Sequence, residues 1–162
     1  MKLLILSDSH REMKYMCLAV QRERPDAVIH LGDHFRDADA LAQEFCALPV
    51  LSVRGNCDFF ESERSEILLR TFEGVRIFGA HGHRYSVKQG LLRFELAARE
   101  QGAQVALFGH THCAYCAQVN GLWLLNPGAC SGSAPSYGVV WIENAEISCH
   151  IVEMFLDLEE KI

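Results

Sequence analysis

Five short clusters of residues that can bind metal ions lie between residues 8 and 112. Each cluster combines Asp, Asn or His with small residues. The clusters are Asp8-Ser9-His10, Gly32-Asp33, Gly55-Asn56, His81-Gly82-His83 and Gly109-His110-Thr111-His112. Imidazoles together with carboxylate and amide oxygens suit hard-to-borderline divalent ions such as Mn²⁺, Fe²⁺ or Zn²⁺, whereas Mg²⁺ alone rarely takes so many imidazoles. These residues therefore predict a transition-metal site.

The spacing inside two clusters predicts how they act. In an extended segment, residues i and i+2 project to the same side, so Asp8 with His10, and His110 with His112, would each reach into one crevice. The residue between each pair would turn away. Glycine precedes the ligand residue in three clusters, as expected where a backbone turns sharply or approaches an ion closely.

Taken singly, each cluster also has an ordinary structural explanation. Asp8-Ser9-His10 is a common kind of turn, and Gly-Asp or Gly-Asn is a common loop dipeptide. The Gly109-His110-Thr111-His112 cluster is a stronger signal. The recurrence of such clusters in five places is what favours a function.

Each cluster closely follows an apolar run that has the length of a buried strand. The runs cover residues 3–6, 27–31, 50–53, 75–78 and 105–108. They are rich in bulky and β-branched side chains, which is typical of strands. Loops at the carboxyl ends of strands form a crevice over a rigid scaffold in open α/β sheets. We therefore expect the five clusters to meet at the strand ends.

The remaining patterns predict an α/β protein with two mixed sheets and helices outside them. Helical spacing over residues 11–24 ends before Pro25, and Asp37 can cap a second short helix, so the chain would open as parallel βαβ units. Residues 67–78 read as a hairpin that turns at Glu73-Gly74.

The second half of the chain adds one helix and four strands to this prediction. Ser86 with Gln89 matches a capping box for a helix that stops near Gly102. Strand-like runs follow at residues 117–119, 122–125, 137–142 and 145–154, the last as an edge strand, and Asn120-Gly121 predicts a tight turn between the first two.

Composition bounds the class of protein. A chain of 162 residues with 49% hydrophobic content can form a single domain over residues 1–162 without disulfides, and seven cysteines fit a reducing compartment. A net charge of −6 without a Lys/Arg cluster argues against a nucleic-acid-binding patch, although bound cations could still attract a small anionic substrate. With neither a membrane span nor a signal segment, we expect a cytoplasmic protein; the oligomeric state stays open, homo-oligomers included.

The ordered motifs Asp-x-His, Gly-Asp, Gly-Asn-Cys-Asp, His-Gly-His and Gly-His-Thr-His resemble those of the calcineurin-like metallophosphoesterases. The short chain is most similar to their small bacterial and archaeal phosphodiesterase branch, and the resemblance covers residues 1 to about 142. It implies a four-layer α/β/β/α sandwich with two divalent metal ions where the loops of the two sheets meet. Mn²⁺ is the first choice, ahead of Fe²⁺, Zn²⁺ or Ni²⁺.

The resemblance also implies a role for each ligand residue. The first ion would be held by Asp8, His10 and His112, the second by Asn56, His81 and His110, and both by Asp33. It further implies a hydrolase in which two ions, about 3.5–4 Å apart, generate a hydroxide that attacks phosphorus in line. A small phosphodiester is the expected substrate. The alternatives are a phosphomonoesterase and a non-catalytic metal-binding scaffold, as in the retromer subunit that resembles this family.

Each of three further residues near the clusters could have either of two roles. Arg54 would orient a phosphate or, slightly favoured, brace the site by pairing with an acid, and His83 would contact substrate or a ligand's neighbour. With Asp33 and Asn56, they complete the candidate catalytic set. Asp58 would orient a ligand or lie solvated in a loop.

Cys57 is a departure from the larger phosphatases of the family, which carry His directly after the Asn. A thiol cannot replace an imidazolium as proton donor at neutral pH without special help. The Cys113-x-x-Cys116 pair is disfavoured as a redox or zinc motif, because it follows the histidine pair instead of opening a βαβ helix. His30 reads as a buried strand histidine and Asn126-Pro127-Gly128 as a supporting turn. Loops 35–39 and 59–64 would shape specificity without a recognisable code.

Overall fold

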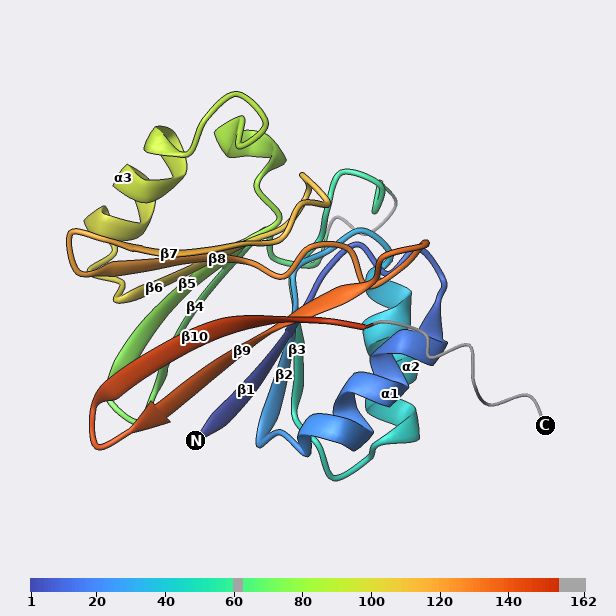
Figure 1. Cartoon of the computed structure of the whole chain (residues 1–162). Helices are drawn as coiled ribbons and strands as arrows, with labels where there is room; N and C mark the ends of the chain where they lie inside the picture. Colours follow the sequence, from blue (N-terminus) through green and yellow to red (C-terminus); the bar gives the residue numbers. More distant parts are fainter. Residues whose placement is uncertain (60–62, 155–162) are drawn as a thin grey trace.

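Two five-stranded sheets face each other across an apolar core in a computed structural model of the chain, which describes residues 1–59 and 63–154 (Figure 1). The first sheet contains, in spatial order, β10 (Glu146–Glu153), β9 (Ser136–Glu143), β1 (Lys2–Leu6), β2 (Ala27–His30) and β3 (Val50–Ser52). The second contains β4 (Ile67–Phe72), β5 (Val75–Ala80), β6 (Val105–Phe108), β8 (Leu122–Asn126) and β7 (Tyr115–Val119).

Helices cover the outer faces of the sheets. The helices α1 (Met13–Glu23) and α2 (Phe35–Glu44) lie on the first sheet, and α3 (Leu92–Glu100) and the short 3-10 helix η1 (His83–Tyr85) lie on the second (Figure 1). The predicted four-layer α/β/β/α sandwich is confirmed. Among the described residues, no helix combines the length and apolar character needed to cross a membrane.

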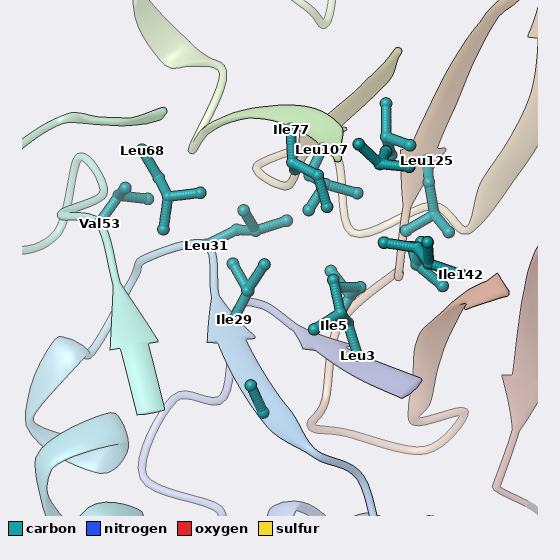
Figure 2. Close-up of a cluster of buried hydrophobic side chains, with 14 residues drawn as sticks. Leu3, Ile5, Ile29, Leu31, Val53, Leu68, Ile77, Leu107, Leu125 and Ile142 are labelled. Carbon is teal, nitrogen blue, oxygen red and sulfur yellow. The ribbon is translucent and has the colours of Figure 1, made fainter. Parts of the chain in front are cut away.

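Strand β1 explains why the apolar runs are continuous. Leu3 and Ile5 pack into the core between the sheets, whereas Leu4 and Leu6 pack under α1 and α2, and all four side chains are fully buried. Figure 2 shows Leu3 and Ile5 directed toward side chains from the opposite sheet, among them Leu107. A strand that is buried on both faces has no polar side to alternate with.

The predicted connections are mostly confirmed. Strands β1, β2 and β3 are parallel neighbours, β4 and β5 form the predicted hairpin, and β10 is an edge strand. Asn120 and Gly121 join β7 to β8 with positive φ angles of 45° and 80°, as a tight hairpin turn requires. All seven cysteines are free thiols.

Two helix starts were predicted wrongly. Ser86 ends η1 in a left-handed conformation, with φ of 55°, and α3 begins only at Leu92, because Gly90 at φ of 152° interrupts any helix between them. Asp37 is not the cap of α2 but its third residue, and its carboxylate accepts hydrogen bonds from Ser9 and from the amide of Arg11. These tertiary partners take the place of the local capping contact.

Candidate metal centre

The loops that carry the five clusters follow strands of both sheets, and they meet where the carboxyl ends of these strands come together. Backbone hydrogen bonds join them in pairs: Asp8 N donates to Gly32 O at 3.1 Å, and Gly109 N donates to His81 O at 3.0 Å. The two sheets are linked at the same place, because the amide of His110 donates to Asp8 Oδ2 at 3.1 Å. The loops after β1 and β2 therefore lie beside those after β5 and β6 (Figure 1).

Four candidate ligand residues form the first group. Potential ligand atoms of Asp8, His10, Asp33 and His112 all lie within 4.8 Å of one another. Asp8 is completely buried, yet its Oδ1 accepts no hydrogen bond from any described residue and lies 3.1 Å from His112 Nε2. A buried carboxylate oxygen without a donor is costly unless a cation neutralises it. The residues of this group therefore fit a divalent ion.

Asn56, His81 and His110 form the second group around the same aspartate. His81 Nε2 lies 3.0 Å from Asn56 Oδ1 and 3.4 Å from Asp33 Oδ1, and the His81 and His110 rings are 5.1 Å apart. His81 Nδ1 lies 2.8 Å from the carbonyl oxygen of Leu31, which can only accept, so Nδ1 carries a proton. Nε2 then faces two oxygens and needs a proton or a metal ion between them, which fits a metal ligand.

The protonation states also fit metal binding. Burial lowers the pKa of His110 to about 4, with a further contribution from His81, so its imidazole is neutral at pH 7. Burial opposes ionisation of Asp33, but the nearby His81 ring and the amide of Cys57 lower the pKa of this carboxyl below its ordinary value. Neutral imidazoles and ionised carboxylates are the forms that bind metals.

The backbone reaches this arrangement by turns and not by extended segments. The φ angles of Asp8, His10, His110 and His112 are 53°, 44°, 67° and 58°. The predicted extended geometry is therefore wrong, although the side chains converge as expected. The intervening hydroxyls do point away: Ser9 donates to Asp37 at 2.6 Å, and Thr111 accepts from Asn126 at 2.9 Å.

Two glycines allow the loops to approach the ligands. A Cβ atom on Gly55 would lie 2.1 Å from Asp33 Oδ1, and one on Gly109 would lie 2.0 Å from Ser7 Oγ and 2.9 Å from Asp8 Oδ2. Such distances are far inside van der Waals contact. Any side chain at either position would push an aspartate out of the centre.

Asp58 is buried and orients a loop that carries a candidate ligand, so it is not a solvated loop residue. Its carboxylate accepts from the amides of Asp33 at 3.1 Å, His34 at 2.9 Å, Phe35 at 3.3 Å and Gly55 at 2.8 Å. It therefore holds Asp33 and caps α2, the role that Asp37 was predicted to have. Its partners lie more than twenty residues away in sequence, apart from Gly55, so no local pattern could indicate this role.

Arg54 and His83 lie beside the second group. Arg54 pairs with Glu66, and the other carboxylate oxygen of Glu66 lies 2.6 Å from Arg84 Nε. Arg54 therefore has the acidic partner that the bracing role requires. The His83 ring lies 5.5 Å from that of His81, and its buried Nδ1 has no partner among the described residues. Sequence reasoning missed Glu66, and no motif in the chain marks it.

Cys57 is exposed and directly follows the candidate ligand Asn56. Its amide donates to Asp33 Oδ1 at 2.9 Å, and burial together with the nearby Asp33 charge raises the pKa of its thiol to about 11. The thiol is thus an even weaker acid than a free cysteine. It is therefore a poor proton donor at neutral pH.

His30 and Asn126 have the surroundings that the sequence predicted, the first as a buried strand histidine and the second as part of a supporting turn. His30 is completely buried, with Nε2 3.0 Å from Ser9 Oγ, and burial lowers its pKa to about 4. Asn126 donates to Gly109 O at 3.0 Å and to Thr111 Oγ1, which steadies the loop that carries His110 and His112. Both residues hold ligand loops from below.

Comparisons with known proteins agree with this geometry. Residues 1–145 match the model of the calcineurin-like phosphoesterase superfamily domain. The chain is 36% identical over 150 residues to the probable metallophosphoesterase YsnB of Bacillus subtilis (strain 168), covering 89% of this chain and 86% of YsnB. It is 27% identical over 165 residues to the phosphodiesterase MJ0936 of Methanocaldococcus jannaschii, covering 90% and 96%.

A solved structure extends the likeness to three dimensions. The crystal structure of a predicted phosphoesterase from Streptococcus pneumoniae TIGR4 superimposes with a TM-score of 0.78 and 25% identity, covering 93% of this chain and 88% of that one. The motifs, the fold and the match over nearly the whole sequence lead to one conclusion: this chain is a member of the calcineurin-like phosphoesterase superfamily.

Proposed function

We propose that the protein is a dinuclear metal-dependent phosphodiesterase. The observation that carries the proposal is the place of Asp33, which lies within the first group of ligand atoms and also 3.4 Å from His81 of the second. A carboxylate shared between two ligand groups is suited to bridging two ions. The preference for diesters is supported by the name of the archaeal relative, a phosphodiesterase.

The proposed ligand sets are those that the resemblance implied. Asp8, His10, Asp33 and His112 would hold one ion, and Asp33, Asn56, His81 and His110 the other. When bound, two divalent ions supply an activated water and stabilise the charge of the phosphoryl oxygens. Mixed imidazole and carboxylate ligands favour Mn²⁺, with Fe²⁺, Zn²⁺ and Ni²⁺ as further candidates.

The protein's own residues position these groups and the substrate. Asp58 holds the backbone of Asp33, and Glu66 pairs with Arg54. We propose that Arg54 and His83 face the substrate phosphate and that Asn56 both binds metal and contacts a phosphoryl oxygen. Because Cys57 is a poor acid, departure of the leaving group depends on the acidity of that group itself.

The wider setting is also a proposal. We propose a single catalytic domain over residues 1–162 that acts on a small phosphoester, without a nucleic-acid-binding patch. Seven free thiols support a reducing compartment such as the cytoplasm.

The experiment is a metal and substrate screen of metal-stripped protein. We expect Mn²⁺ to restore hydrolysis of bis-p-nitrophenyl phosphate more than that of p-nitrophenyl phosphate, with up to two ions bound per chain. Asp33→Asn should abolish turnover and lower the metal content, whereas the exposed Asp26→Asn control should do neither. Preference for the monoester would indicate a phosphomonoesterase, and two bound ions without turnover of either ester would favour the scaffold.

A further inference from the structure

A cavity of about 480 Å³ opens beside the metal centre. It is lined by Arg11, His34, Phe35, Arg36, Asp37, Cys57, Asp58 and Phe59. Three of these residues directly follow ligands in the sequence, namely Arg11 after His10, His34 after Asp33, and Cys57 after Asn56. The His34 ring lies 5.4 Å from that of His10. A group in this cavity would therefore adjoin a phosphate held at the metal centre.

Two of the lining residues are arginines. Arg11 and Arg36 are exposed, and neither guanidinium forms an ion pair or a hydrogen bond with any residue that the structure describes. Neighbouring arginines differ: Arg54 and Arg84 both pair with one glutamate, and Arg64 pairs with an aspartate. Guanidinium groups at a cavity wall are suited to bind phosphate or carboxylate oxygens.

The two acids in the wall are already occupied. Asp58 accepts four backbone amides, and Asp37 accepts from a hydroxyl and an amide. Because Asp58 takes the first amides of α2, this helix end offers little to an anion, and the arginines must supply the attraction. The chain carries a net charge of −6, so an anion would be attracted only locally.

An aromatic side chain completes the cavity. Phe59 is 79% exposed, which is a high exposure for a large apolar ring that lines a cavity. The buried Phe35 contributes to the wall and lies under Arg64, 4.5 Å from ring centre to guanidinium. An exposed aromatic face is a suitable platform for a planar ring, such as a nucleobase.

We propose that this cavity binds an ester group that carries a second phosphate and an aromatic ring, so that the preferred substrates are phosphodiesters of phosphorylated nucleosides. The second phosphate would bind Arg11 and Arg36, and the base would lie against Phe59. This inference rests on the proposed function for the chemistry at the first phosphate, and it adds a substrate class to it.

A pair of chromogenic esters tests the second phosphate. Thymidine 5′-(4-nitrophenyl phosphate) and its 3′-phosphorylated form share one leaving group. In both, water adds to phosphorus, the bond to the nitrophenyl oxygen breaks, nitrophenolate departs and one proton is released. We expect kcat/KM of Mn²⁺-loaded protein to be about tenfold higher for the 3′-phosphorylated ester, as charge-assisted hydrogen bonds would give. The preference should shrink as salt concentration rises.

Single substitutions assign the preference to the arginines. Arg11→Gln and Arg36→Gln should each reduce the ratio of the two kcat/KM values several-fold. Arg76→Gln is the matched control, because it removes the same charge from an exposed residue at the start of β5 and should leave the ratio unchanged. Equal kcat/KM for the two esters in the unmodified protein, or a ratio that survives both cavity substitutions, would overturn the proposal.

A binding measurement separates this proposal from the proposed function. Calorimetry with thymidine 3′,5′-bisphosphate and thymidine 5′-monophosphate needs no turnover. We expect about tenfold tighter binding of the bisphosphate, lost in Arg36→Gln, even if no ester is hydrolysed. Equal affinities would refute the cavity's role while hydrolysis of bis-p-nitrophenyl phosphate still supported the phosphodiesterase. Tighter binding without any hydrolysis would support the cavity and refute the enzyme.

Discussion

The Asp58 carboxylate accepts four backbone amides around the metal centre, so its removal should cost stability before any metal binds. The amides belong to Asp33, His34, Phe35 and Gly55, at 2.8 to 3.3 Å, and the Asp58 residue is only 7% exposed. At about 1 kcal/mol of net stability for each hydrogen bond, Asp58→Ala should lose about 4 kcal/mol. That is a large part of the roughly 5–15 kcal/mol that stabilises a typical domain.

Urea unfolding of the metal-free protein measures this loss. Asp58→Asn keeps one acceptor oxygen and should lose about half as much as Asp58→Ala. The matched control is Asp39→Ala, which removes a carboxylate that is 44% exposed and paired with Arg64, and should cost no more than about 1 kcal/mol. Both Asp58 variants should also bind less metal, because the backbone of Asp33 is no longer held.

The refuting result is specific. If Asp58→Ala unfolded at the same urea concentration as the unmodified protein, with the same dependence on urea, the four amides would not depend on this carboxylate. Full metal content in the same variant would show that the position of Asp33 is set by other contacts.

Three further predictions concern the metal ligands, the pH dependence and the leaving group. His112→Ala should deplete one ion and His110→Ala the other, as read by anomalous diffraction at the metal edge. Burial lowers the pKa of His30 from its ordinary 6.5 to about 4. The contribution of the neutral ring to the free energy of unfolding is therefore complete above pH 6.5 and is lost as pH falls toward 4. Between pH 7 and pH 4, the free energy of unfolding of the metal-free protein, measured with urea, should therefore fall by about 3 kcal/mol more than that of the His30→Asn variant. The kcat/KM for aryl phosphodiesters should fall steeply as leaving-group pKa rises, and Cys57→His should flatten that dependence, because general acid catalysis helps only poor leaving groups.

Each of these predictions has an opposing outcome. Loss of the same single ion in both histidine variants would refute the division into two ligand groups. An equal acid sensitivity with and without His30 would mean that its ring takes up a proton in the folded state. A flat leaving-group dependence in the unmodified protein would reveal a general acid elsewhere, with His83 as the first residue to replace.

The chain's local patterns were enough to predict the strands and the presence of the three α-helices, but not where α2 and α3 begin. The apolar runs predicted buried strands because β1 and its parallel neighbours are covered on both faces, which leaves no polar alternation. Turn chemistry located the hairpins at Glu73-Gly74 and Asn120-Gly121, where a positive φ is needed. The start of α3 was missed, because the conformation of Gly90 outweighs the capping box at Ser86.

The candidate ligands were likewise visible in the sequence, because metal binding depends on side-chain type and because ligand loops follow strand ends. Their separation into two groups around Asp33 depends on distances between loops that lie up to about a hundred residues apart, as between Asp8 and His110. Only the tertiary structure could supply these distances. It also decided the roles of Asp58 and Glu66, because a carboxylate's partners are set by which backbone or guanidinium lies beside it after folding. For the same reason, Arg11 and Arg36 look like ordinary charged residues in the sequence. Only the tertiary structure places both at the wall of one cavity, where neither guanidinium has a partner among the residues that the structure describes.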